Sequence, residues 1–193
     1  STPLASGVAA LVRSARPELT PIQVREALRS TADNSSAPDN SRGWGKIDAW
    51  RALLHHGMVI STNPKIFWDG KVNRIAAYVL SPDAIQASTV RISYQIDKGP
   101  DAQLAMALHQ STDGLGAGSG LYIADLPALP ADATVRFFIT ASDAKESRTS
   151  PYGAPAKRHS FRAGETRNEG AEYIFSKTFV LEPAFPDPAP AGR

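Results

Sequence analysis

The sequence predicts a mixed fold, with helices over residues 1–57 and an all-β sandwich over residues 58–182. Apolar residues recur at helical spacing before residue 57, and they alternate with polar residues from Met58 onward. The 193 residues are 42% hydrophobic and 21% charged, which is ordinary for a globular protein. This length allows one domain or two small ones. The remaining residues, 183–193, are rich in proline, and we expect a disordered tail there.

The first helix is expected from Pro3 to Ala15. Leu4, Val8, Leu11 and Val12 follow the i, i+4, i+7, i+8 spacing of one helix face. The other faces carry mostly alanine and glycine. A helix that is apolar or small nearly all round is typical of a protein interior, so we expect this helix to be buried.

Two further helices have recognisable start signals. Thr20-Pro21-Ile22-Gln23 fits a capping box, with proline at the first helical position, and this helix should end near Ala32. Asp48 is expected to cap a third helix over 49–56, closed by Gly57. Residues 33–47 between the two helices are predicted to form loop.

From Met58 onward, a period of two predicts β-strands joined by turns. Val90, Ile92 and Tyr94, for example, alternate with polar residues, which is typical of a half-buried strand. Several short strands at this spacing favour an immunoglobulin-like or fibronectin-like sandwich over a closed barrel. The expected strands are 66–68, 74–80, 89–97, 103–109, 121–124, 134–142, 158–162 and 172–181.

Composition excludes several function classes. Lys plus Arg is 21 and Asp plus Glu is 19, and a net charge of +2 does not favour nucleic-acid binding. No apolar run approaches the roughly 18 residues that a membrane span requires, so no membrane partner is expected. The chain has no cysteine, which excludes disulfides, thiolate metal sites and cysteine nucleophiles.

The four histidines do not form a predicted metal site. His55 and His56 end a helix, where a positive charge suits the helix dipole, and adjacent helical residues point about 100° apart. His109 should face outward from its strand, and His159 lies in a strand-like segment. We therefore interpret all four as structural or solvent-exposed residues.

The acidic, basic and aromatic residues considered as possible binding residues are also interpreted as structural or solvent-exposed. Loop residues Asp97, Asp101 and Asp113 could contact Ca²⁺, but they lack a ligand ladder and are interpreted as turn residues. The helix arginines are interpreted as solvated; they are Arg13, Arg16, Arg25 and Arg29. The aromatic residues are interpreted as sandwich core rather than a sugar-binding platform; they are Trp68, Tyr78, Tyr94, Tyr122, Phe137 and Phe138.

Three motifs in the first 57 residues resemble subtilisin-like serine proteases. Ser1-Thr2-Pro3 matches the end of the signature G-T-S-x-[SA]-T-P, and residues 4–11 match its small-residue helix, with Leu4 and Ala5 where His and Val are common. Residues 17–32 are similar to the family's next helix. Residues 43–49 are similar to its closing G-x-G-x-[VI]-[DN]-A motif. The resemblance implies that these helices are the C-terminal part of an α/β subtilisin-like catalytic domain.

The resemblance also implies where the chemistry lies. The family uses a Ser-His-Asp triad in the order Asp, His, Ser, and its serine stands two residues before the position of Ser1. The triad is thus expected upstream of this chain. Ser1, Thr2 and Pro3 flank the missing nucleophile, and the chain alone is expected to be inactive. We reject Ser1 itself as an N-terminal nucleophile, because the family pattern makes that position a small packing residue.

The resemblance implies a secreted endopeptidase that acts on protein or peptide substrates. This chain needs no cofactor, although relatives of the family bind Ca²⁺ and the full-length protein could do so. The partner of residues 1–57 would be the upstream catalytic segment. Without it, the exposed apolar face of the first helix should make the fragment sticky, whereas the sandwich should fold independently.

A second hypothesis belongs to another class. The β region looks like the immunoglobulin-like or fibronectin-like modules appended to secreted bacterial proteases, with Gly120–Pro127 and Val135–Asp143 as the familiar stretches. On this alternative the helices are vestigial, and the sandwich is a non-catalytic binding or adhesion module.

Overall fold

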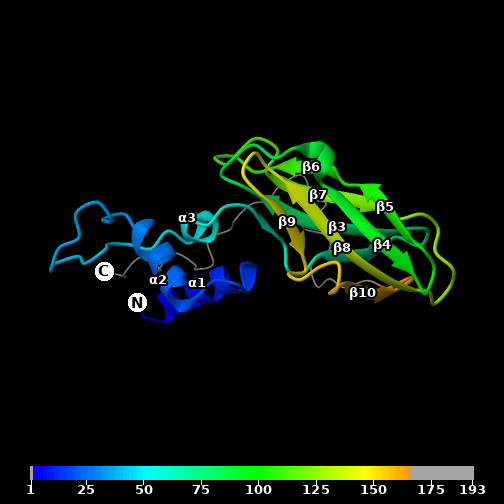
Figure 1. Ribbon diagram of the computed structural model, residues 1–193, viewed down its shortest axis with the longest axis horizontal. Coiled ribbons are helices and arrows are strands. Elements are labelled where there is room, and N and C mark those ends of the chain that lie inside the picture. Colours follow the sequence, from blue (N-terminus) through cyan, green and yellow to red (C-terminus); the bar gives the residue numbers. More distant parts are fainter. Residues whose placement is uncertain (1, 166–193) are drawn as a thin grey trace, which may run out of the picture.

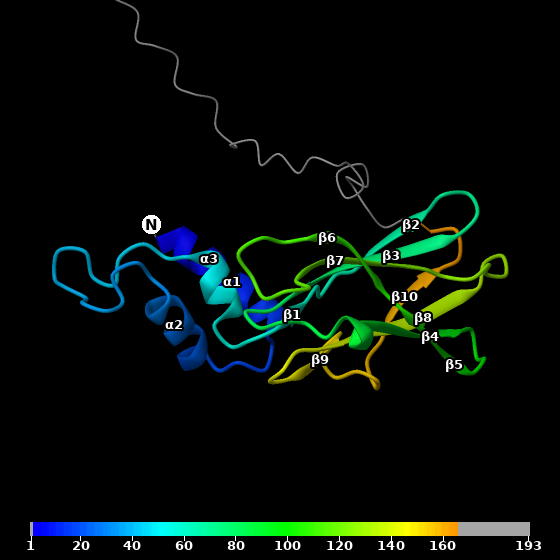
Figure 2. The ribbon, with the colours of Figure 1, turned by 90° about the horizontal axis from the view of Figure 1, so that it is seen from above.

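The computed structural model describes residues 2–165, and it consists of a small helical part joined to two antiparallel sheets (Figure 1). The helical part lies at one end of the longest axis of the molecule, and the sheets lie at the other end (Figures 1 and 2). The helices are α1 (Thr2–Ala15), α2 (Pro21–Ser30) and α3 (Ala49–Leu54). The first strands are β1 (Val59–Ile60), β2 (Lys65–Trp68), β3 (Asn73–Leu80), β4 (Arg91–Ile96) and β5 (Asp101–Ala105). The others are β6 (Ala107–Ser111), β7 (Gly120–Asp125), β8 (Thr134–Ser142), β9 (Ser147–Ser150) and β10 (His159–Arg162), and a short 3₁₀ helix, η1 (Ala87–Thr89), precedes β4.

Both predicted helix caps are present. The Thr20 hydroxyl accepts a hydrogen bond from the Gln23 amide at 3.3 Å, and the Gln23 side chain accepts one from the Thr20 amide at 2.8 Å. Asp48 caps α3 by accepting a hydrogen bond from the Arg51 amide at 2.9 Å. The third helix ends at Leu54 rather than His56, so it is shorter than the sequence predicts.

The helical part has a small core of its own. α1, α2 and α3 bury Val12, Leu19, Val24, Ala27 and Ala52 between them. Leu53 and Leu54 of α3 instead pack with Val59 and Leu80 of the first sheet. One apolar cluster therefore joins the helical part to the strands.

The two sheets have simple antiparallel orders, which are compatible with a β-sandwich. In the first sheet, β1 and β2 both pair with β3, and β7 and β6 follow. In the second sheet, β9 and β10 both pair with β8, and β4 and β5 follow. Side chains from both sheets fill one shared core, whose largest fully buried members include Ile75, Tyr122, Phe137, Ile139 and Phe161.

One predicted strand is in fact two. The sequence predicts a single strand over 103–109, but β5 belongs to the second sheet and β6 to the first. The chain crosses between sheets at Met106, which is 4% exposed and donates a backbone hydrogen bond to the Val90 carbonyl. Because Met106 points into the core shared by both sheets, the alternation of residues continues unbroken through the crossing.

The structure also adds two short strands and corrects the predicted burial of several aromatic residues. The short strands β1 and β9 were not predicted, because two and four residues give too little alternation to recognise. Trp68 was expected in the core but is 39% exposed, and Tyr78 and Phe138 are only half-buried. Tyr94, Tyr122 and Phe137 are buried as predicted. The expected strand 172–181 and tail 183–193 lie outside the described residues.

Candidate functional site

The N-terminal motif stands at the start of α1. Ser1 lies outside the described residues, whereas Thr2 is the first residue of α1 and Pro3 the second. A helix of 14 residues is about 21 Å long, so this motif and the C-terminal end of α1 are well separated.

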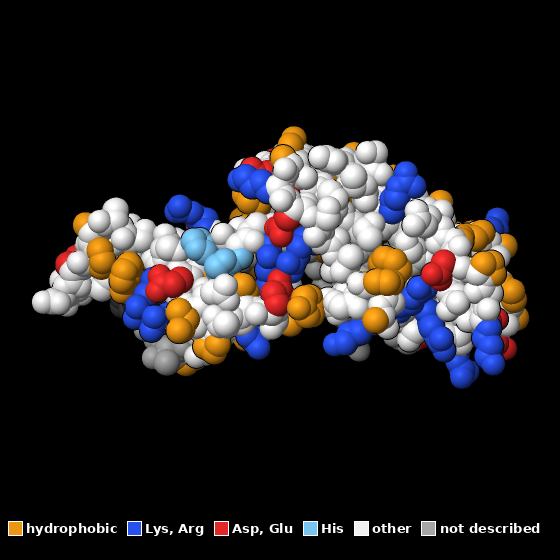
Figure 3. Space-filling view, in the orientation of Figure 1, with side chains coloured by type: hydrophobic (Ala, Val, Ile, Leu, Met, Phe, Trp, Pro, Cys, Tyr) orange, Lys and Arg blue, Asp and Glu red, His pale blue; other side chains and the backbone are white. Residues whose placement is uncertain are grey.

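In this chain α1 is not buried all round, and it carries the exposed apolar face that is expected without an upstream covering segment. Only Val12 among its apolar residues is buried, and Leu4 and Leu11 are 77% and 46% exposed. Ile22 at the start of α2 is 63% exposed. Figure 3 shows hydrophobic side chains on the surface of this helical part. Exposed apolar side chains gathered on one helix indicate a contact surface for another segment or partner.

A separate groove lies between α1 and α2. It has a volume of about 500 Å³ and is lined mainly by small and aliphatic side chains, with two arginines. The Arg13 guanidinium donates a hydrogen bond to the carbonyl oxygen of Leu19, which ties the two helices together beside the groove. The lining residues are Ala9, Ala10, Arg13, Pro21, Val24, Arg25 and Leu28.

Arg16, interpreted from sequence as solvated, is instead a buried residue where the helices meet the sandwich. Its Nη2 donates to Glu146 Oε1 at 2.6 Å and to the Met58 carbonyl at 3.1 Å. Its side chain is only 7% exposed. Burial lowers the pKa of Arg16, and repulsion from Arg148 lowers it further, while Glu146 opposes the shift.

A second ion pair flanks the first. Arg148 of β9 donates to Glu18 Oε1 at 2.7 Å, and Arg16 Nη1 lies 3.7 Å from the same oxygen. Figure 3 shows acidic and basic side chains gathered where the helical part meets the sandwich. We call Arg16, Glu18, Glu146 and Arg148 the junction. No local pattern in the sequence predicts it, because Arg16 and Glu146 are 130 residues apart.

A turn and a glycine hold Glu146 in place. Asp143 Oδ1 accepts hydrogen bonds from the amides of Lys145 and Glu146, which hold the turn between β8 and β9. Burial raises the pKa of Asp143, but its hydrogen bonds, the largest from Ser81, outweigh burial and lower it. Gly57 has φ +98°, and a Cβ there would overlap the Glu146 carboxylate. The approach of Glu146 to the Met58 amide, at 2.6 Å, therefore requires glycine at position 57.

The histidine rings make local contacts within the described residues. The rings of His55 and His56 make an edge-on contact with centroids 4.8 Å apart, and His56 Nε2 lies 3.2 Å from the Gln23 carbonyl. His159 is more buried, and its Nε2 lies 3.1 Å from the Ser150 hydroxyl. Burial lowers the pKa of His159. Burial and the neighbouring His56 lower that of His55.

The acidic residues considered for Ca²⁺ have structural roles. Asp97 has φ +50° and accepts a hydrogen bond from the Thr134 amide at 2.8 Å. Asp101 receives two hydrogen bonds from Arg158, at 2.6 and 2.8 Å, which lower its pKa. Within residues 2–165, no group of three or more His, Asp or Glu side chains is arranged to hold a metal ion. No helix in the same part of the chain is long and apolar enough to cross a membrane.

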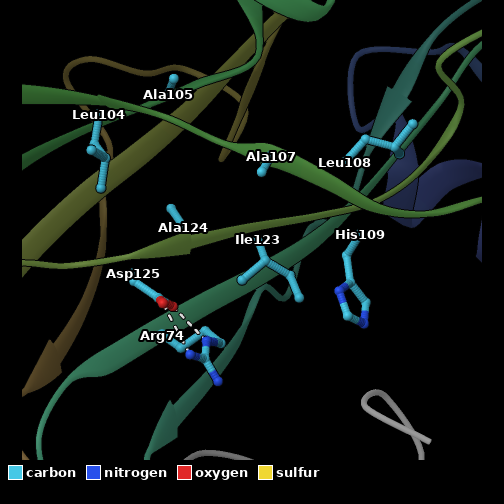
Figure 4. Close-up of a pocket in the computed structure, with 9 residues that line it drawn as sticks. All are labelled: Arg74, Leu104, Ala105, Ala107, Leu108, His109, Ile123, Ala124 and Asp125. Atoms are coloured by element: carbon cyan, nitrogen blue, oxygen red, sulfur yellow. Dashed lines mark hydrogen bonds and ion pairs between the residues drawn. The ribbon is translucent and has the colours of Figure 1, made fainter. Parts of the chain in front are cut away.

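A hollow in the sheets lies where the chain crosses between them. It has a volume of about 490 Å³, and Ala105, Ala107 and Ala124 leave it open by their small size. Figure 4 shows the Arg74–Asp125 ion pair on one side and His109 on the other. The other six lining residues are alanine, leucine or isoleucine, so the middle of the hollow suits an apolar side chain.

Comparison with known proteins finds a family match in the helical part. A family model described as the subtilase family matches residues 1–45, which cover α1, α2 and most of the following loop. The match stops before α3 and includes none of the strands. No curated protein matches the chain. Residues 1–45 are therefore similar to the subtilase family.

Proposed function

We propose that this chain is the C-terminal part of a secreted subtilisin-like serine endopeptidase. The supporting observation is the subtilase match over residues 1–45, a range that includes the sequence Ser1-Thr2-Pro3. In this proposal the Ser-His-Asp triad precedes residue 1, and the substrate is a protein or peptide. Residues 1–57 complete the catalytic domain, and the strands form an immunoglobulin-like accessory module.

The exposed face of α1 supports the same proposal. In the whole enzyme this helix would run behind the nucleophile, with Leu4 and Leu11 packed against upstream strands. Each fully buried leucine contributes about 1.5–3 kcal/mol relative to exposure, so covering two of them would help hold the upstream segment on α1. The positive N-terminal end of the helix would then favour the oxyanion that forms during acyl transfer.

The strand orders support the accessory module. One sheet contains β1/β2, β3, β7 and β6, and the other contains β9/β10, β8, β4 and β5. These orders agree with the ABED and CFG sheets of immunoglobulin domains, with β5 as an added strand beside C.

The test is expression of the full reading frame beside chain 1–193 alone. The full protein should hydrolyse a fluorogenic peptide and react with a serine-directed fluorophosphonate, and alanine at the upstream serine should abolish both. Chain 1–193 should do neither. Peptide hydrolysis by chain 1–193 that the fluorophosphonate blocks would contradict the location of the triad. An upstream frame without Asp, His and Ser motifs would contradict the proposal as a whole.

A further inference from the structure

The hollow beside Met106 lies at an open corner of the two sheets. β5 is the edge of one sheet and β6 is the edge of the other. β6 pairs with β7 only as far as Ile123, so Ala124 and Asp125 continue past the end of β6. The corner therefore combines an apolar hollow with strand edges that can accept another strand (Figure 4).

The β6 edge has little protection of its own. Its residues Ala107–Ser111 are all exposed, and the only protective irregularity is a bulge between Leu108 and Gln110. The strand carries no Lys, Glu, Asp or Pro, which are the residues that natural proteins place on free edges. Leu108 is 43% exposed beside the hollow. An uncharged edge with an exposed leucine indicates that another segment covers it.

The described chain ends close to this corner. The Asn73 side chain accepts a hydrogen bond from the Gly164 amide at 3.0 Å and donates one to the Glu165 carbonyl at 3.1 Å. Asn73 is fully buried, and the next residue, Arg74, lines the hollow. Residue 165 is thus held beside the strand that carries one wall of the hollow.

The sequence beyond residue 165 contains a suitable segment. Residues 172–181 read EYIFSKTFVL, in which a period of two places Tyr173, Phe175, Phe179 and Leu181 on one face together with Lys177. The pattern is that of a strand with one aromatic face, and proline first follows at residue 183. Six residues lie between 165 and 172, and the seven extended steps from one to the other span up to about 25 Å.

We propose that segment 172–181 adds as an extended strand at this open corner and places an aromatic side chain in the hollow. The short tether favours this occupant over a second copy of the chain, because it gives an effective concentration of about millimolar. The inference concerns only the β region and does not depend on the proposed protease function.

Hydrogen exchange of the full chain, residues 1–193, tests the proposal. Amides 172–181 should exchange at least about tenfold more slowly than those of 187–193, a ratio that corresponds to 1.4 kcal/mol. Ala107→Trp, which fills the hollow, should remove this protection. Ala128→Trp, in an exposed loop, should leave it unchanged. Exchange of 172–181 as fast as that of 187–193 would overturn the proposal, and so would protection that survives Ala107→Trp.

A second pair of variants guards against misfolding. Phe175→Ser should reduce the protection of the segment more than Ile174→Ser, because the two residues lie on opposite faces of the predicted strand. If Ala107→Trp also speeds the hydrogen exchange of β8, that variant has disturbed the sandwich, and this second pair then serves as the test. Equal effects of the two substitutions would overturn the proposal. Protection that rises with protein concentration would also overturn it, because the occupant would then be a second copy.

Discussion

Replacement of Arg16 by methionine should destabilise the attachment of the helical part to the sandwich. The substitution removes the 2.6 Å charged hydrogen bond to Glu146 and the 3.1 Å bond to the Met58 carbonyl, both made by a side chain only 7% exposed. A hydrogen bond to a charged group contributes about 1.5–3 kcal/mol and a neutral one about 1. Methionine recovers part of the packing, and the lost arginine no longer suffers desolvation. We therefore expect a loss of about 2–3 kcal/mol in the free energy of unfolding.

Urea titration by tryptophan fluorescence measures this loss. A Trp68→Phe background leaves Trp44 and Trp50, so the signal reports only the helical part. Arg25→Met is the matched control, because Arg25 is on an exposed face of α2 with its side chain 54% exposed. The control should change stability by less than about 0.5 kcal/mol. A double-mutant cycle with Glu146→Gln should give a coupling energy of about 1–3 kcal/mol. If Arg16→Met changes stability no more than Arg25→Met does, the junction does not hold the two parts together.

Three further predictions concern the cap, the glycine at the junction and pH. Thr20→Ala should cost about 1 kcal/mol through loss of the capping box, measured by urea unfolding, whereas Thr20→Ser should be nearly neutral; equal costs would mean that the hydroxyl does not act as the cap. Gly57→Ala should cost roughly 1–2 kcal/mol more than Gly70→Ala, because both have positive φ but only Gly57 faces Glu146; similar thermal shifts for the two would contradict the close approach. Burial lowers the folded-state pKa of His159, so its contribution to stability is present above the unfolded pKa of about 6.5 and is lost as the pH falls. Stability measured from pH 7 to 5 should therefore fall less steeply for His159→Gln than for wild type, with some slope remaining from His55; an unchanged slope would show that His159 does not contribute.

The sequence predicts those features that depend on neighbouring residues. Both helix caps and the period-two strands follow from contacts within a few positions, where residue type and backbone preference act together. The helical motifs were likewise sufficient to predict the subtilase relationship. Features that join distant segments were not predicted. Arg16 is in a stretch that reads as solvated helix, and only the fold brings Glu146 to it.

The crossing at Met106 was missed for a different reason. Leu104, Met106 and Leu108 keep one alternation, so nothing in the sequence marks the change of sheet. The hollow beside Met106 depends on that change, because it lies where the pairing of β6 with β7 ends, at Ala107 and Ile123. Sequence patterns report which face of a strand is buried, but they do not report which sheet the strand joins.

The two ends of β3 lie a fixed distance apart. Val59, just after the helices, pairs with Leu80 at one end of β3, and Asn73 at the other end holds Gly164 and Glu165. Eight residues of strand span about 25 Å. The sandwich is therefore a rigid spacer, and the junction fixes its angle to the helices. Any ligand bound near residue 165 would therefore lie at a constant distance of about this size from the helical part.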